Sequence, residues 1–107
     1  MNECIINIET IKRLVSEKKI IWRNHILVRM QQRGIKINDV IECVMSGKII
    51  EYYYDDYPYP SCLILGCINE ETCLHVVCAV GENKVWMITA YTPDKEEWYD
   101  DLKTRRE

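Results

Sequence analysis

The chain opens with three segments in which apolar residues recur at the three- and four-residue spacing of a helix. We expect the first helix over residues 8–17, whose sequence is IETIKRLVSE. The second is expected to cover Trp22 to Arg33 and to end at Gly34, a residue type that commonly terminates helices. For the third, Asn38 is expected to cap the first turn and Gly47 to end the helix. The first half of the chain is therefore predicted to be helical.

In the second half the spacing changes to short runs rich in β-branched and aromatic residues, separated by turn residues. The runs are IIEYYYD, SCLILGCIN, TCLHVVCAV and KVWMITAYT, and we expect four strands that are mostly antiparallel. Pro93 and Asp94 then precede KEEWYDDLKTRR, which predicts a C-terminal helix with acidic residues in its first turn. The chain is therefore predicted to be a single α+β domain spanning residues 1–107.

Composition is typical of a compact globular protein, with 48% apolar and 29% charged residues. Its longest apolar runs fall far short of the roughly 20 residues of a membrane span, so we expect a cytoplasmic protein without a membrane partner. Charge is distributed unevenly: residues 1–50 carry nine basic and five acidic groups, whereas residues 51–107 carry five and twelve. The basic half is suited to phosphate contacts, while the pI of about 5.4 argues against strong nonspecific binding of nucleic acid.

Six cysteines in a chain of this length raise the question of a metal site. If the second and third strands pair around residues 69–71, Cys67 lies opposite Cys73, and Cys62 lies opposite Cys78. Five positions separate the two cysteines of each strand, so they point to opposite faces, roughly 17 Å apart at about 3.3 Å per residue. They cannot surround one tetrahedral ion, and we expect no metal. Buried free thiols are the expected state, with cross-strand disulfides as the alternative.

One helical segment, WRNHILVRMQQRG, carries an unusual basic stripe. His25, Arg29 and Arg33 follow at positions i, i+4 and i+8, so they project from one side of the predicted helix. Arginine stays charged and grips phosphate oxygens, and histidine exchanges a proton near neutral pH. The stripe is therefore suited to phosphodiester chemistry, although a solvated helix face explains the same spacing. Arg23 falls off this side and is expected to be solvated.

The predicted strands supply weaker candidates. His75 shares a face with Leu63 and other apolar residues, where a lone histidine is typically a core residue with satisfied hydrogen bonds. Thr89 and Tyr91 share a face of the last strand, and Tyr91 precedes the turn into the predicted C-terminal helix. The tyrosine-rich stretch EYYYDDYPYPSC is interpreted as a protein contact surface or as packing along a strand edge.

Several motifs spread along the chain match a known pattern. They are W-x-x-H-x-x-x-R-M-x-x-R-G-I from Trp22, Y-P-x-P-S from Tyr57, LHVV from Leu74 and ITAY-x-PD-x-x-x-W from Ile88. Together they resemble domain-of-unknown-function family 4258, over about residues 15–105. That family is similar to the RelE/ParE toxin superfamily. The resemblance implies a RelE-like fold, in which N-terminal helices pack on a four-stranded, mainly antiparallel sheet followed by a C-terminal helix.

The same resemblance implies a function. Proteins of this kind are typically toxins of type II toxin-antitoxin pairs, and many are metal-independent endoribonucleases acting on messenger RNA without a cofactor. The implied partners are RNA, free or on the ribosome, and a cognate antitoxin such as a zinc-finger protein of the MqsA type. The alternative is a noncatalytic protein-binding or RNA-binding module on the same fold, which predicts that acidic partners neutralise the basic stripe.

The resemblance also assigns roles to residues. A metal-free ribonuclease activates the 2′-hydroxyl, stabilises charge on the phosphate and protonates the leaving 5′-oxygen. Arginines would hold the phosphate, a histidine would transfer protons, and a tyrosine would orient the substrate or donate a proton. The candidate catalytic residues are His25, Arg29, His75 and Tyr91, and the candidate substrate-binding residues are Arg33 and Thr89.

Overall fold

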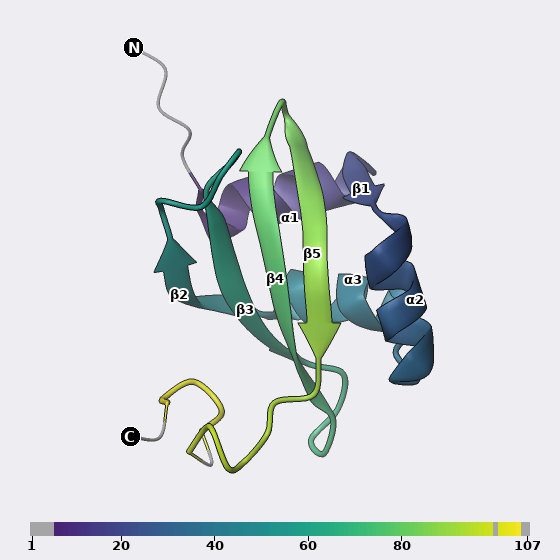
Figure 1. Ribbon diagram of the computed structural model, residues 1–107, viewed down its shortest axis with the longest axis vertical. Coiled ribbons are helices and arrows are strands. Elements are labelled where there is room, and N and C mark those ends of the chain that lie inside the picture. The colour runs from purple at the N-terminus through teal and green to yellow at the C-terminus, as the bar shows by residue number, and fades with distance from the viewer. Residues whose placement is uncertain (1–5, 100, 106–107) are drawn as a thin grey trace.

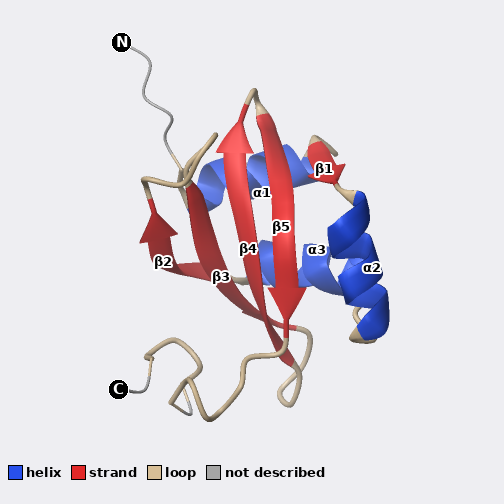
Figure 2. Ribbon diagram, in the orientation of Figure 1, coloured by secondary structure: helices blue, strands red, loops and turns tan. Residues whose placement is uncertain are grey.

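The computed structural model describes residues 6–99 and 101–105, which form three helices and a five-stranded mixed sheet (Figures 1 and 2). The helices are α1 (Ile8–Ser16), α2 (Asn24–Gln32) and α3 (Ile37–Ser46), and the strands are β1 (Ile20–Trp22), β2 (Lys48–Tyr53), β3 (Ser61–Cys67), β4 (Cys73–Gly81) and β5 (Lys84–Tyr91). The strand order is β1-β5-β4-β3-β2. Over the described ranges, no helix is long and apolar enough to cross a bilayer. The predicted α+β class is confirmed.

The four-stranded sheet expected from the sequence is wrong because β1 adds a fifth strand. β1 runs parallel to β5, with Ile20 opposite Val85 and Trp22 opposite Met87. The Val85 N–H donates to the Lys19 carbonyl at 2.9 Å, just before the strand begins. Trp22 therefore ends a strand rather than starting a helix, and α2 begins two residues later. A three-residue strand has no periodicity of its own to reveal it, because its partner is distant in the sequence.

The ends of the helices follow local capping rules. α1 begins after Asn7, whose side chain accepts a hydrogen bond from the Thr10 N–H at 2.7 Å. α2 is followed by Gly34, whose φ of 70° is the left-handed conformation that glycine adopts readily. α3 starts at Ile37, earlier than the predicted cap at Asn38. The Asp39 carboxylate accepts from the Lys36 N–H at 3.0 Å and thereby fixes the earlier start.

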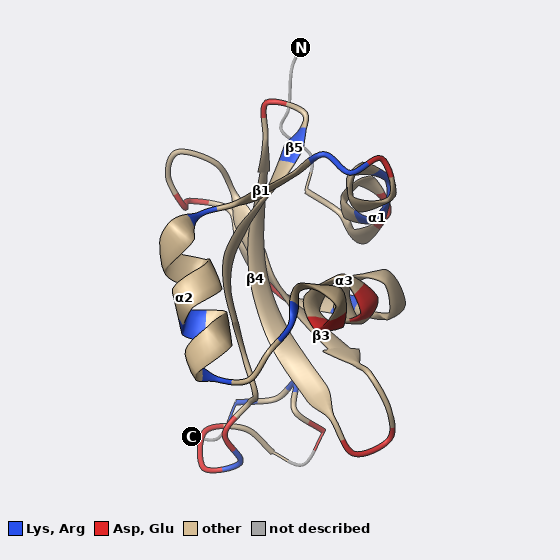
Figure 3. Cartoon of the chain, turned by 90° about the vertical axis from the view of Figure 1, so that its right-hand side faces the viewer, with Lys and Arg blue, Asp and Glu red and all other residues tan. Residues whose placement is uncertain are grey.

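Helices cover the two faces of the sheet unequally. α1 and α3 lie behind the sheet in Figure 1, and in Figure 3 α2 lies on the opposite side of the sheet from them. Ile64 and Val76 belong to the buried core between the sheet and the helices α1 and α3. Ile26 and Met30 of α2, which lies beside the β5 edge, belong to the same core. The other face, which we call the front face, carries alternate residues of the strands. They include Ser61, Leu63, Leu65, His75, Val77, Ala79, Trp86, Thr89 and Tyr91.

The predicted C-terminal helix is wrong in the residues that the structure describes. Residues 95–97 form a turn, and Trp98 pairs with Arg105 in an isolated antiparallel bridge. The Asp94 side chain accepts from the Glu96 N–H, and the Asp101 side chain accepts from two following backbone N–H groups. Such local side-chain bonds compete with helical ones. The helix is also opposed by the burial of Trp98, which is 1% exposed, on the front face.

The expected hairpin register is confirmed. Cys67 lies opposite Cys73 and Cys62 opposite Cys78. Cys67 and Cys73 form a disulfide, the alternative left open by the sequence, while Cys62, Cys78 and Cys43 are buried free thiols. Cys62 lies in the core and Cys67 is exposed, so the two face opposite sides of the sheet.

A close contact between α3 and the sheet depends on a glycine. At Gly66, on the core face of β3, an added Cβ would overlap the backbone carbonyl of Cys43 in α3. Neither backbone segment can withdraw easily, because α3 and β3 are both packed in the core. The contact therefore requires a residue without a side chain at this position.

Replacing Gly66 with alanine is expected to lower the free energy of unfolding by about 3 kcal/mol or more, because the methyl group must displace backbone atoms. Gly34→Ala is the matched control, because open space surrounds Gly34 and only its positive φ is strained. We expect that control to cost about 1 kcal/mol. Urea denaturation of both variants measures the two values. Equal losses would show that α3 does not approach β3 as closely as described.

Candidate functional site

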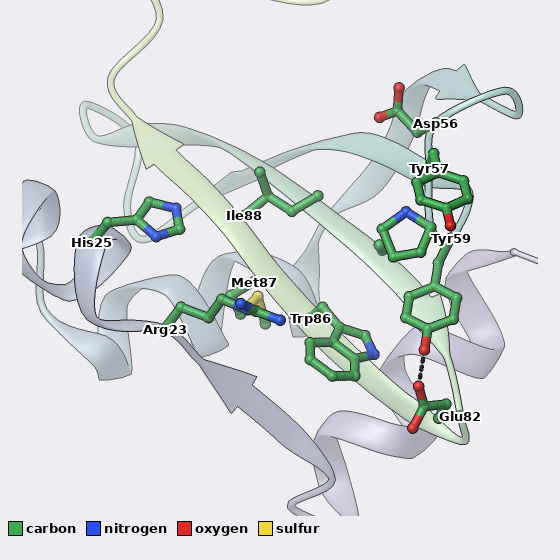
Figure 4. Close-up of a pocket in the computed structure, with 11 residues that line it drawn as sticks. Arg23, His25, Asp56, Tyr57, Tyr59, Glu82, Trp86, Met87 and Ile88 are labelled. Carbon is green, nitrogen blue, oxygen red and sulfur yellow. Dashed lines mark hydrogen bonds between the residues drawn. The ribbon is translucent and has the colours of Figure 1, made fainter.

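A pocket of about 530 Å³ hollows the front face near the β4–β5 turn (Figure 4). Its floor is formed by β4 and β5, where Trp86 and Ile88 are the large side chains. On one side lie Arg23 and His25, at the start of α2, which we call the cationic wall. On the other side lies the β2–β3 connection, residues 56–59, which we call the loop wall. The pocket thus combines the basic segment and the tyrosine-rich segment of the sequence.

A β-bulge shapes the floor. Val77 pairs with Thr89 and Cys78 pairs with Met87, so Ile88 is an extra residue on β5. Bulges redirect side chains and are frequent beside functional sites. Ile88 is 38% exposed and lines the pocket as an apolar surface.

The Trp86 indole organises the floor of the pocket. Its Nε1 donates to the Gly81 carbonyl at 3.0 Å, which fixes the orientation of the ring. The Arg23 guanidinium lies 5.4 Å from the ring centroid, and the Tyr59 ring lies 5.6 Å away at a tilt of 32°. Figure 4 shows Arg23 and Tyr59 approaching Trp86 from opposite sides. Arg23 is exposed, as expected, but it contributes to the site, which the helical spacing alone did not indicate.

The basic stripe of α2 lies along β5. His25 lines the pocket at one end. At the other end, Arg33 Nη1 donates to the Ala90 carbonyl at 2.9 Å and lies 3.4 Å from the Thr89 hydroxyl. Arg29 lies one turn from each of these residues, so it projects from the same side and is exposed. Arg33 is therefore tied to the edge of β5, whereas Arg29 points to solvent.

No carboxylate neutralises this stripe within residues 6–99 and 101–105. The ion pairs found there involve Arg13, Lys19 and Arg105, not His25, Arg29 or Arg33. α2 has no acidic residue in its first turn and no side-chain cap. The partial positive charge at the N-terminus of α2 therefore adds to the charge of the cationic wall. Figure 3 shows basic but no acidic positions along α2.

The second candidate group lies at the other end of the front face. His75 is fully buried, and its Nε2 lies 2.6 Å from the Leu102 carbonyl. Since a carbonyl can only accept, Nε2 carries the proton, and Nδ1 accepts from the Tyr91 hydroxyl at 3.3 Å. The Trp98 ring packs edge-on against the imidazole, with centroids 4.5 Å apart. Burial lowers the pKa of His75, so the ring is a satisfied, neutral core group.

An ion pair fastens the C-terminal segment over this histidine. Arg105 donates from Nε and Nη2 to the two carboxylate oxygens of Glu51, at 2.8 and 3.1 Å. The same guanidinium lies 4.6 Å from the centroid of the Trp98 ring. These hydrogen bonds from Arg105 lower the pKa of Glu51. The sequence offered no sign of the Glu51–Arg105 pair, because 54 positions separate its members.

The predicted site residues therefore fall into separate places. His25 lies in the open pocket. Arg33 and Thr89 contact each other at the edge of β5. His75 and Tyr91 form a covered pair beneath the C-terminal segment. The structure does not bring the two histidines into one constellation.

A comparison with known protein families identifies the family of this chain. The family described as Domain of unknown function (DUF4258) matches residues 22–92, two thirds of the sequence, and the chain belongs to that family. The matched range includes the basic stripe, the pocket residues and the His75–Tyr91 pair. No curated protein and no solved structure gives a significant match.

The buried state of His75 predicts a pH dependence of stability. Below about pH 6.5 the histidine of the unfolded chain takes up a proton that folded His75, with its lowered pKa, does not. The free energy of unfolding is therefore expected to fall as pH drops from about 7.5 to about 5.5, by at most about 1.4 kcal/mol per pH unit for one proton. Urea denaturation at a series of pH values measures this slope.

The His75→Gln variant is expected to lose this slope, whatever its overall stability. His25→Ala is the matched control and is expected to keep it, because that ring is exposed in the folded protein. A slope that persists in His75→Gln would show that another group is responsible.

Proposed function

We propose that this protein is the toxin of a type II toxin-antitoxin pair and cleaves messenger RNA without a metal ion. The observation that carries the proposal is the cationic wall with its neighbouring stripe, which has no carboxylate partner in the described residues. A stripe that served only as a solvated structural face would gain from ion pairs with the acidic half of the chain. Its unpaired charge instead suits an anionic ligand such as RNA.

In this proposal His25 is the proton-transfer residue. Its ring is exposed on the wall of the pocket and can approach a 2′-hydroxyl directly. The imidazole takes the proton of the 2′-hydroxyl, whose oxygen attacks the adjacent phosphorus. The bond to the 5′-oxygen breaks, and that oxygen receives a proton from the imidazolium or from water. Arg29 and Arg23 stabilise the charge that develops on the phosphate oxygens.

The other histidine has a supporting role in the proposal. Both ring nitrogens of His75 are occupied by protein groups, and the ring is covered by the C-terminal segment. Tyr91 is half-buried against it, and burial raises the pKa of its hydroxyl. Proton transfer to RNA by this pair would require the segment to leave the sheet. We therefore assign His75 and Tyr91 a structural role in the part of the front face that the C-terminal segment covers.

The aromatic lining of the pocket suits single-stranded RNA. Bases without a pairing partner stack on aromatic side chains, and Trp86, Tyr57 and Tyr59 line the pocket. Tyr57 is 95% exposed, so its ring is available to a ligand. Because the chain as a whole is acidic, we expect binding to depend on this one pocket rather than on a broad electrostatic surface.

A toxin of this kind needs a partner that silences it. We propose a cognate antitoxin, such as a zinc-finger protein of the MqsA type, encoded in the neighbouring reading frame. The noncatalytic alternative is favoured by one observation: Arg33 is engaged with the Ala90 carbonyl and His75 is covered, which leaves His25 as the single accessible histidine of the described residues. A module that only binds RNA needs no second proton-transfer group.

Alanine at His25 or Arg29 is expected to relieve the growth arrest caused by expression of the protein. Cleavage of messenger RNA by the purified variants is expected to fall by about 10²- to 10⁴-fold for His25→Ala, the usual contribution of general acid-base catalysis. Growth curves after induction and RNA cleavage with and without ribosomes measure the two effects.

The matched control is Arg13→Ala. Arg13 is an exposed arginine of α1, across the sheet from α2, and its loss removes a similar charge away from the pocket. It is expected to leave arrest and cleavage unchanged. Thermal melting establishes that all three variants remain folded. Full activity in both the His25 and the Arg29 variant would overturn the site, and RNA binding without cleavage in the wild type would favour the noncatalytic module.

A further inference from the structure

Arg33 and Thr89 form a polar pair at the far end of the basic stripe, outside the pocket. Arg33 Nη1 donates to the Ala90 carbonyl at 2.9 Å and lies 3.4 Å from the Thr89 hydroxyl oxygen. The Nε and Nη2 groups of Arg33 have no hydrogen-bond partner among the described residues, and no carboxylate there pairs with this guanidinium. Thr89 accepts from Arg33, so its own hydroxyl hydrogen can be donated to a ligand. The pair therefore offers a restrained cation with free donors, which suits an anion.

The pair stands at a defined separation from His25. α2 and β5 run side by side in the same direction, because His25 lines the pocket with Ile88, whereas Arg33 bonds at Ala90. His25 and Arg33 are eight positions apart, with Arg29 midway between them. A step of four residues along a helix rises about 6 Å, so the two ends of the stripe are about 12 Å apart along the axis.

This spacing matches the backbone of an extended nucleic-acid strand, in which adjacent phosphates are separated by nearly one such step. A strand whose scissile phosphate lies at His25 passes Arg29 and brings another phosphate to Arg33 two nucleotides away. The strand must be unpaired, because the aromatic lining of the pocket can stack only on a base that is free of its partner. Acidic side chains of a protein have no fixed spacing of this kind, so the regular repeat favours RNA.

We propose that Arg33 and Thr89 form a second phosphate subsite for single-stranded RNA, two phosphates away from the one that is cleaved at His25. The inference rests on the proposed RNA function and adds a binding site beyond the reacting group. Arg33 supplies charge-assisted hydrogen bonds, and Thr89 supplies a neutral one. The subsite touches no bond that breaks, so it strengthens the binding of a substrate with three or more phosphates and leaves the chemical step unchanged.

The test is isothermal titration of the full chain with 2′-O-methyl oligouridylates that contain one to five phosphates. These ligands lack the 2′-hydroxyl nucleophile, so binding is measured independently of cleavage. We expect the affinity to rise up to the third phosphate and to change little beyond it. For ligands with three or more phosphates, Arg33→Gln is expected to weaken binding about tenfold. It is also expected to make the slope of log K against log salt concentration shallower by about 0.7, the value for one phosphate of a single strand.

Thr89→Val separates the contribution of the hydroxyl from that of the charge. It is expected to weaken the same ligands about fivefold and to leave the salt slope unchanged, because the hydroxyl is neutral. Neither variant is expected to affect the ligand with one phosphate, which binds at the pocket. Arg13→Gln is the matched control, an exposed arginine of α1 across the sheet, and is expected to change nothing. Thermal melting checks that the variants fold, and the length series on the wild type tests the proposal even when one variant does not.

Equal weakening of short and long ligands by Arg33→Gln would overturn the subsite, because Arg33 would then serve only to hold β5. An affinity that does not rise beyond the first phosphate would also overturn it, as would equal binding of a duplex or of an oligoglutamate of the same charge. The outcomes are separable from the proposed function. Length-dependent binding without any RNA cleavage would support the subsite and overturn the ribonuclease, whereas His25-dependent cleavage with length-independent affinity would overturn the subsite alone.

Discussion

The parallel pairing of β1 with β5 is the constraint on which the pocket depends. It brings the segment around Arg23 to the edge of the sheet beside Trp86, far from it in the sequence. The pairing ends at Trp22, so on that side the rest of β5 has no neighbouring strand in the described structure and is bordered by α2. If β1 continued along β5, α2 would be displaced from the sheet edge and the cationic wall would not exist.

In this arrangement the uneven distribution of charge along the sequence becomes an uneven distribution of charge around the pocket. The basic half supplies the cationic wall, and the acidic half supplies Asp56 and Glu82, which also line the pocket. The two halves meet across one pocket instead of cancelling in ion pairs. Farther along the front face the same two charge types do pair, as Glu51 with Arg105, and there they close the surface over His75. Open and closed regions of one sheet face are thus distinguished by whether their charges are paired.

Features set by neighbouring residues were predictable from the sequence. The helical spacing located α1 and α2, and Gly34 marked a helix end. The turn expected around residues 69–71 gave the hairpin register with Cys67 opposite Cys73, and strand alternation gave the faces on which the side chains lie. The same alternation placed His75 among apolar residues of the front face, where its hydrogen bonds are satisfied within the protein. In each case the information lay within one element or one hairpin.

Features set by distant contacts were not predictable in this way. The short strand β1, the Arg23–Trp86 contact and the Glu51–Arg105 pair each join segments far apart in the chain. The C-terminal stretch had helical signals, but the side chains of Asp94 and Asp101 form local turns. The burial of Trp98 against His75 then selects those turns over a helix. Tertiary packing outweighs a propensity of a few tenths of a kcal/mol per residue.

Arg33 shows how a structural contact and a binding role are compatible. Its guanidinium has five N–H donors, and Nη1 already bonds to the Ala90 carbonyl, with the Thr89 hydroxyl close by. These bonds restrict a flexible side chain before any ligand arrives. A phosphate that met the remaining donors would therefore cost less side-chain entropy than one bound by a freely moving arginine. The prediction that Arg33 binds the substrate is thus physically consistent with Arg33 holding the edge of β5.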